Sequence, residues 1–258
     1  MGRLEHRYGE NVHIVTDPWT RTCLMRLSSP ASGGLTFHRL LDSAFRRILT
    51  AATEQMSRKT FDVATRMAET EPRAVLIEEY LDPDQRVVIV DVARGGMIPS
   101  HICQLLLLEV LPDEAVRVDH IYMQRVTDGS GRVAGVETAG SKIGGSVDGA
   151  VIIIPDPMAA TGASMAEVID LYSSRLDGTP AKIIVCHLIV TPEYLRKIQD
   201  LPHDVTVYAM RVDRGLSDPE VLETVPGTHW DRERGLDDQD YIVPGAGGLG
   251  ELINNAFV

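Results

Sequence analysis

The chain has 258 residues, of which 44% are hydrophobic, so it can bury a full core as one α/β domain without a second domain. Its 25 lysines and arginines against 37 acidic residues give a net charge of −12, which argues against general binding to nucleic acid or anionic membranes. The three cysteines lack paired spacing, and no stretch reaches the roughly 18 apolar residues of a membrane span. We therefore expect free thiols, no zinc site and a cytoplasmic protein.

The first 34 residues are polar and are interrupted by Pro18, Pro30 and two glycines. They predict an irregular N-terminal arm, residues 1–34, in front of a main domain, residues 35–258. From Leu35 to Ala52 the apolar positions recur every three or four residues, which predicts an amphipathic helix that packs on the domain.

Apolar segments typical of buried strands alternate with helical patterns through the rest of the chain. The expected strands are Arg86–Val92, Val116–Tyr122, Val151–Ile154, Lys182–Val190 and Val205–Val212, and the expected helices are Pro99–Val110, Ala163–Leu176 and Pro192–Asp200. This alternation predicts the α/β class, with a mostly parallel twisted sheet covered by helices on both faces. The segment Val126–Val147 is rich in Gly, Ser and Thr and predicts a flexible hairpin or lid, with a surface loop that has no role as the alternative.

The stretch from Val151 to Ser164 is the centre of the predicted site. Four β-branched residues form a buried strand, Pro155 ends it, and a turn of small residues leads into a helix. The backbone N–H groups of such a turn lie at a helix N-terminus, where they are unpaired and attract phosphate. Asp156 would lie at the carboxyl edge of the sheet, where it could accept hydrogen bonds from ribose hydroxyls. An ordinary turn without a ligand is the alternative.

A second candidate follows the strand that ends near Val92. Arg94 precedes Gly95 and Gly96, which free the backbone to bend sharply and hold the arginine at the same edge as Asp156. A guanidinium suits a pyrophosphate because its planar fork can donate two parallel hydrogen bonds. A surface arginine on a turn is the alternative.

The run Asp156–Ser164, DPMAATGAS, closely resembles the phosphoribosyl pyrophosphate loop of uracil phosphoribosyltransferases, which carries a single acid at its start where most other phosphoribosyltransferases carry two. Arg94-Gly95-Gly96 resembles the family's Arg-Ala-Gly, and Arg125 stands where the family has a second arginine. The resemblance implies a phosphoribosyltransferase type I fold with a small hood or lid. It implies a phosphoribosyl pyrophosphate site made of Arg94, Arg125, Asp156, Pro157, Met158, Ala159, Ala160, Thr161, Gly162, Ala163 and Ser164, with Arg94, Arg125 and Asp156 as the catalytic group.

The C-terminal segment 240–253, which we call the base loop, resembles the family's uracil-recognition loop through Tyr241–Gly245, Gly247 and Gly250. The resemblance implies that main-chain groups of Ile242, Gly247, Gly248 and Leu249 bind the base. The chain departs from the family here. Gly248 stands where the family has an aspartate that touches the ribose or its metal, and Glu251 replaces a second aspartate, so that the base and the metal geometry stay open.

The resemblance implies that uracil and phosphoribosyl pyrophosphate give UMP and pyrophosphate. Mg²⁺ would be bound mainly through the substrate pyrophosphate, with no separate protein metal site, and the chain would form a homo-oligomer. Two alternatives stay open: a phosphoribosyltransferase for another pyrimidine-like base, and a catalytically silent nucleotide-binding regulator on the same fold.

Four other patterns are assigned no role in the site. GAGGLG within the base loop matches a dinucleotide fingerprint, but only eight residues follow it, too few for the rest of that fold. His101 and Cys103 fall on different faces of a predicted helix and do not form a metal site. His187 lies in an apolar run and is expected to be a satisfied core residue, and the run His229–Arg234 is expected to be a solvated loop.

Overall fold

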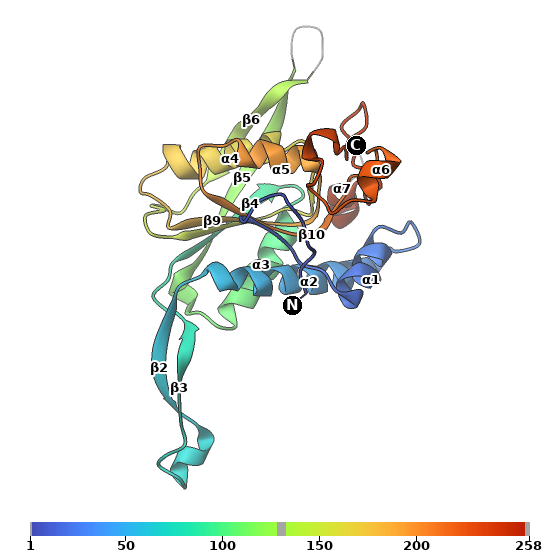
Figure 1. The fold of residues 1–258 in the computed structure, drawn as a ribbon. Coiled ribbons are helices and arrows are strands. Elements are labelled where there is room, and N and C mark those ends of the chain that lie inside the picture. The colour runs from blue at the N-terminus through green and yellow to red at the C-terminus, as the bar shows by residue number, and fades with distance from the viewer. Residues whose placement is uncertain (1, 128–132, 256–258) are drawn as a thin grey trace.

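The computed structural model describes residues 2–127 and 133–255 and contains a central sheet with the strand order β1-β10-β9-β7-β4-β5-β6 (Figure 1). All neighbouring strands are parallel except β6, which runs antiparallel to β5. The strands are β1 (Val12–Ile14), β4 (Val87–Ala93), β5 (Val116–Thr127), β6 (Val133–Lys142), β7 (Val151–Pro155), β8 (Met158–Ala159, paired with β9), β9 (Lys182–Val190) and β10 (Val205–Val212). The predicted mostly parallel α/β sheet is confirmed.

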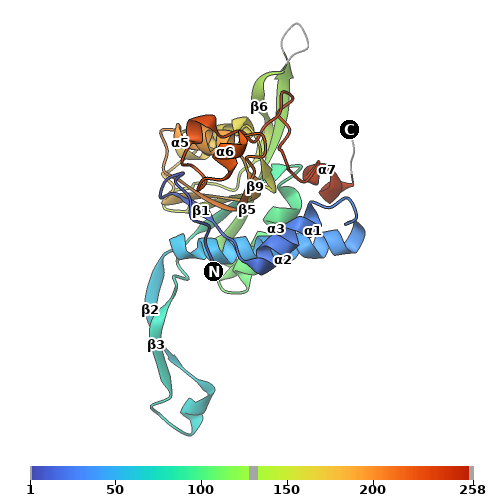
Figure 2. The same ribbon diagram turned by 45° about the vertical axis from the view of Figure 1, so that its right-hand side comes forward.

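Helices cover both faces of this sheet (Figure 2). One face is covered by α1 (Pro18–Leu27), α2 (Gly34–Ala52) and α3 (Met97–Leu108), and the other by α4 (Ala163–Asp170), which continues as a π-helical turn over Leu171–Arg175, and α5 (Pro192–Gln199). Two short helices, α6 (Pro219–Leu222) and α7 (Leu249–Asn254), lie in the C-terminal part. Four 3₁₀ turns span Thr53–Gln55, Arg66–Glu69, Asp113–Ala115 and Trp230–Arg232.

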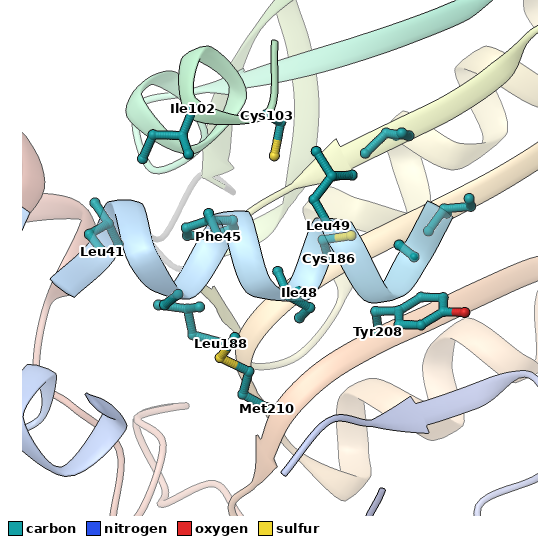
Figure 3. Packing of buried hydrophobic residues seen from close by; sticks show 14 of the residues in the cluster. Leu41, Phe45, Ile48, Leu49, Ile102, Cys103, Cys186, Leu188, Tyr208 and Met210 are labelled. Carbon is teal, nitrogen blue, oxygen red and sulfur yellow. The ribbon is translucent and has the colours of Figure 1, made fainter. Parts of the chain in front are cut away.

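The amphipathic stripe predicted for α2 lies against the sheet. Its buried residues contact α3 and the strands β9 and β10, as Figure 3 shows with Phe45, Ile48, Cys186 and Tyr208 among the labelled side chains. Because this stripe is apolar along its whole length, its burial is the main contribution of α2 to stability. All three cysteines are buried free thiols, as expected.

Residues 1–34 are more ordered than the sequence pattern indicated. The strand β1 pairs with β10 at the edge of the sheet, and α1 begins at Pro18 with Asp17 as its N-cap. The Asp17 carboxylate accepts a hydrogen bond from the N–H of Thr20 at 2.9 Å. The expectation of an irregular segment was therefore wrong, because an aspartate followed by proline is itself a helix-start signal.

A two-stranded ribbon, β2 (Arg58–Ala64) and β3 (Val75–Leu81), extends away from the sheet (Figures 1 and 2). Most of its side chains are exposed on both faces. No strand was predicted here, because strands without a buried face lack the alternation of apolar and polar residues by which strands are recognised.

The segment Val126–Val147, predicted as a hairpin or lid, contains the end of β5 and the whole of β6, two antiparallel strands that pair from His120 and Lys142 to Thr127 and Val133. Residues 128–132 of that segment lie outside the described residues. Within the described ranges, no helix combines the length and apolar character needed to cross a bilayer.

Candidate functional site

The turn between β7 and α4 surrounds a cavity of about 290 Å³ at the carboxyl edge of the sheet. Asp156 and every residue from Met158 to Ser164 line this cavity, together with Val92, Met165, His187 and Tyr194. Pro157 does not line it, because its carbonyl faces β9 and accepts hydrogen bonds from the N–H groups of Leu188 and Ile189. The structure thus brings together all but one of the residues predicted for this loop, which we call the phosphate loop (156–164).

Gly162 is the residue on which the shape of the phosphate loop depends. It lies directly before α4 with φ = 82°, a left-handed conformation that L side chains rarely adopt. A Cβ at this position would lie 3.1 Å from Cδ2 of Tyr194 and 3.2 Å from Cγ of Lys197. Both the backbone conformation and the packing of α5 against the turn therefore require glycine.

His187 of β9 and Thr191, the N-cap of α5, support the phosphate loop through hydrogen bonds, although neither was predicted to belong to the site. His187 is fully buried, and its Nδ1 lies 2.7 Å from the carbonyl oxygen of Asp156, while its Nε2 lies 2.7 Å from the hydroxyl of Tyr194. Burial lowers the pKa of His187 to about 4, so the ring is neutral. In a neutral ring whose Nδ1–H donates to the Asp156 carbonyl, Nε2 has no proton and accepts a hydrogen bond from the Tyr194 hydroxyl.

The prediction that His187 is a satisfied core residue is confirmed, since both its nitrogens have partners. Through these two hydrogen bonds His187 also connects Asp156 to Tyr194 of α5, a role that the local sequence pattern does not indicate. Thr191 adds a second link, since its hydroxyl donates to the carbonyl of Ala160 at 2.7 Å and accepts from the N–H of Tyr194 at 3.0 Å. These bonds fix the phosphate loop to β9 and α5.

The carboxyl of Asp156 is partly buried at the start of the phosphate loop. Desolvation raises its pKa from 3.8 to about 6, and the hydrogen bond from the N–H of Met158, at 3.3 Å, offsets only part of this effect. Protonation of Asp156 near neutral pH therefore costs little free energy. The ionised carboxylate is stabilised by any ligand group that donates a hydrogen bond to it.

Asp156→Asn is expected to stabilise the protein at pH 8 and not at pH 4. Asp156 ionises at about 6 in the native state and near 3.8 when unfolded. The native state therefore binds the proton more tightly, and the wild type loses stability as the pH rises through this window. The shift, 6 − 3.8, corresponds to a loss of about 3 kcal/mol, which asparagine avoids. Urea midpoints at both pH values measure this.

Asp62→Asn, which removes an exposed carboxylate from the β2–β3 ribbon, is the matched control for that experiment, and its effect on stability is expected to be small. A stability gain for Asp156→Asn that is the same at pH 4 and pH 8 would contradict the raised pKa.

Arg94 and its two glycines lie beside the phosphate loop. A Cβ on Gly95 would lie 3.4 Å from Oδ1 of Asp156, and a Cβ on Gly96 would lie 2.8 Å from the N atom of Val92. Bulkier residues at these positions would separate the two loops. The Arg94 side chain is exposed, and among the described residues it makes no ion pair. The guanidinium is therefore available to a ligand at this edge.

Arg125, the other predicted arginine, lies on β5, where its backbone is opposite Val136 of β6. Its side chain lies outside the described residues. The strand places its Cα on the same sheet as Arg94, with β4 and β5 as direct neighbours.

The base loop meets the Arg94 turn from the other side. A Cβ on Gly250 would lie 3.7 Å from the Cα of Gly95, and the side-chain amide of Asn254 donates to the carbonyl of Arg94 at 3.1 Å. Ile242 and Leu249 are buried in the core, so only their main-chain groups can face a ligand, as the predicted mode of base binding requires. The turn of Arg94 thus lies between the phosphate loop and the base loop.

Gly248 and Glu251 are the positions where the base loop departs from the family pattern. The carboxylate of Glu251 folds back over Gly248 and lies in the volume that a Cβ on Gly248 would occupy, with Cδ 3.0 Å from that position. Within the described part of the chain, this carboxylate has no ion-pair partner. An acid from position 251 therefore reaches the space above position 248.

The run His229–Arg234 is only in part the solvated loop that its charges indicated, since Asp231, Arg232 and Arg234 are exposed while the other three residues are not. Glu233 is fully buried and accepts hydrogen bonds from the hydroxyl of Tyr8 and from Arg214. Trp230 packs edge-on against Tyr8, with ring centroids 5.1 Å apart. These residues tie the N-terminal segment to the C-terminal part, a contact across the whole chain that a local charge pattern cannot reveal.

Comparisons with known proteins agree with this arrangement. A family model described as uracil phosphoribosyltransferase matches residues 14–232. A uracil phosphoribosyltransferase of Campylobacter curvus is 24% identical over 248 residues, covering 96% of this chain and 100% of the relative. One from Burkholderia thailandensis is 28% identical over 244 residues, covering 94% of each chain.

Among solved structures, the AQ2163 protein of Aquifex aeolicus has a similar fold, with a TM-score of 0.70 at 20% identity over 96% of this chain and 99% of that one. The matches in sequence extend over nearly the whole chain. This protein therefore belongs to the uracil phosphoribosyltransferase family and is an enzyme of the phosphoribosyltransferase class.

Proposed function

We propose that this enzyme converts uracil and phosphoribosyl pyrophosphate to UMP and pyrophosphate, as a cytoplasmic enzyme of pyrimidine salvage. The observation that carries the proposal is the position of Gly95, which lies against Asp156 of the phosphate loop on one side and against Gly250 of the base loop on the other. A phosphate site, a guanidinium and a base site then meet at one edge of the sheet, where open α/β sheets bind ligands.

The phosphate loop is suited to the 5′-phosphate. The N–H groups at the start of α4 carry partial positive charge, and the hydroxyls of Thr161 and Ser164 can donate to the same anion. Asp156 lines this cavity and would accept hydrogen bonds from the ribose hydroxyls. This division is consistent with charge, because a carboxylate repels a phosphate and attracts a hydroxyl donor.

Arg94 and Arg125 would bind the pyrophosphate as it leaves. Negative charge accumulates on the leaving group while the ribose acquires oxocarbenium character, so catalysis consists mainly of positioning and charge stabilisation. Mg²⁺ would supply further positive charge and would be bound mainly through pyrophosphate oxygens. Within the described residues, no three His, Cys, Asp or Glu side chains converge on one point.

Glu251 would supply the carboxylate that Gly248 cannot. Its position over Gly248 supports this, because the shorter residue at 248 is what leaves room for the longer acid. The base itself would be recognised by main-chain groups of Ile242 and of Gly247 to Leu249, which can meet the alternating donors and acceptors of a pyrimidine edge.

Pyrophosphate release from phosphoribosyl pyrophosphate and Mg²⁺, followed with uracil, cytosine, thymine, orotate, hypoxanthine and no base, tests this function. Release with uracil alone supports the proposal. Preference for a different pyrimidine identifies another acceptor, an alternative that the departures from the family pattern at Gly248 and Glu251 leave open. No release with any base, combined with measurable UMP binding, points to a nucleotide-binding regulator instead.

We also propose that the chain forms homo-oligomers in which the β2–β3 ribbon contacts a second copy. A two-stranded sheet is marginally stable alone, and the cross-strand register places Val63, Leu76, Phe61 and Tyr80 on one exposed face. Further exposed apolar side chains lie on α3 and just after its end, with Leu105 44% and Val110 61% exposed. In a two-fold symmetric dimer, the ribbon of each copy can pack on the α3 surface of the other, so both apolar surfaces are covered.

Leu76→Glu is expected to weaken this association at least tenfold, because it places a charge in an apolar contact. Sedimentation equilibrium measures the dissociation constant. Thr60→Lys, on the opposite face of the ribbon beside Glu79, is the matched control and is expected to leave association unchanged. A wild type that is monomeric at micromolar concentration would rule out the dimer.

A further inference from the structure

The base loop is held by two side chains at the end of β10. Asp213 is 2% exposed, and its Oδ2 accepts a hydrogen bond from the N–H of Gly245 at 2.8 Å. The guanidinium of Arg211 donates to the carbonyl of the same Gly245 at 2.8 Å and to both carboxylate oxygens of Asp213, at 2.5 and 2.8 Å. Both main-chain groups of Gly245 are therefore bound by one ion pair.

This ion pair is itself fixed in place. Arg211 also donates to the hydroxyl of Ser28, the residue that ends α1, at 3.3 Å. A buried carboxylate that accepts hydrogen bonds from an arginine and a backbone N–H has its charge compensated, whereas removal of one partner leaves that charge uncompensated. The pair therefore holds a single geometry, which it imposes on the loop.

The position of Gly245 gives the pair its effect on the base loop. Upstream, the loop is bound to neighbouring segments, since Val243 donates to the carbonyl of Gly235 and accepts from the N–H of Gly215. Gly245 directly precedes the segment Ala246–Gly248. Gly247 in this segment has a φ of 71°, and because glycine has no side chain, its backbone conformation is not fixed by the residue itself. The direction in which Gly247 and Gly248 present their main-chain groups thus follows from how Gly245 is held.

We propose that Arg211 and Asp213 are positioning residues that determine which base the enzyme accepts. This inference rests on the proposed function, in which backbone groups of the base loop read the base. A site that recognises its ligand by main-chain groups cannot be tuned by side chains at the contact itself. Its selectivity depends on the residues that set the path of the backbone, and displacements of about half an ångström suffice to lose such recognition.

The chain contains a matched control with the same three residues, Arg-Val-Asp. Arg117 donates to both carboxylate oxygens of Asp119, at 2.9 and 3.1 Å, and to the carbonyl of Gly145, while Asp119 accepts from the N–H of Gly144. Asp119 is fully buried. This second pair lies near the start of β5, at the amino edge of the sheet, and binds a different glycine turn.

Arg211→Lys and Arg117→Lys are compared, because lysine keeps the charge and loses the planar fork. With Arg211→Lys, the KM for the base is expected to rise about 10- to 100-fold and selectivity over the base panel to fall, while the KM for phosphoribosyl pyrophosphate changes less than about threefold. With Arg117→Lys, both KM values and the selectivity are expected to match the wild type. Melting temperatures separate these effects from general destabilisation.

Amide hydrogen exchange over residues 242–249 of the free protein gives a readout that does not need turnover. Arg211→Lys is expected to accelerate this exchange at least tenfold, and Arg117→Lys to leave it unchanged. Unchanged exchange with Arg211→Lys, or an equal rise in both KM values, would overturn the positioning role. If the wild type turns over no base, the proposed function fails, and the exchange result then decides whether the pair holds the loop.

Discussion

Replacing Arg94 with alanine is expected to weaken binding of pyrophosphate-containing ligands by about two to three orders of magnitude, the usual effect of removing a charge-assisted, bidentate donor. The Arg94 side chain is exposed, and its neighbour Gly95 lies beside Asp156 and Gly250. Among the described residues, Arg94 makes no ion pair that the substitution would remove. Binding of UMP, which lacks the pyrophosphate, is expected to change less than about threefold. Calorimetric titration with phosphoribosyl pyrophosphate and Mg²⁺, with pyrophosphate, and with UMP measures the difference.

The selectivity of this loss is what identifies the role of Arg94. Arg39→Ala removes another exposed arginine, on α2, and is expected to affect none of the three ligands. Arg94→Lys is expected to recover part of the affinity, because the charge returns without the fork. Equal losses for pyrophosphate and UMP would place Arg94 at the 5′-phosphate or assign it a structural role.

Gly162→Val is expected to reduce the affinity for phosphoribosyl pyrophosphate and for UMP alike, by more than about 100-fold. Both ligands carry the 5′-phosphate, and the variant changes the turn that surrounds the phosphate cavity. A β-branched residue at φ = 82° is strained, and its side chain would press on Tyr194 and Lys197 of α5. The turn must move, which displaces the N–H groups at the start of α4.

Gly149→Val is the control for backbone strain. Gly149 also has a positive φ, 65°, but a Cβ there would meet no atom within 4 Å. It is expected to lower the melting temperature without changing the affinity for either ligand. Retention of UMP binding by a folded Gly162→Val variant would falsify the assignment of the 5′-phosphate to this turn.

The buried strands and the phosphate loop could be predicted because their signals are local. β7, β9 and β10 are mostly apolar and almost entirely buried, and the turn after Pro155 combines small residues with a helical pattern. Their edges in the structure agree with the sequence pattern to within a residue. Burial on both faces leaves few alternatives for such segments, which makes their pattern easy to recognise.

What the sequence could not reveal depends on partners far along the chain. His187 was expected to be satisfied, but nothing in its surroundings indicates that its partners are the Asp156 carbonyl and Tyr194. Glu233 is buried and Trp230 half-buried, and both contact Tyr8, which lies more than 200 residues earlier. The β2–β3 ribbon was not predicted because it packs on nothing within the described chain, so its sequence lacks the alternation that a buried face produces.

The fold of the Glu251 carboxylate over Gly248 has a consequence for engineering and for divergence within the family. The two positions share one volume, so a side chain can be accommodated at 248 only if residue 251 is shortened or turned away. A single exchange at either position would crowd or empty the same space, whereas a paired exchange would conserve it. Relatives that carry an aspartate at both positions must therefore direct the acid at 251 away from the volume that Glu251 occupies here.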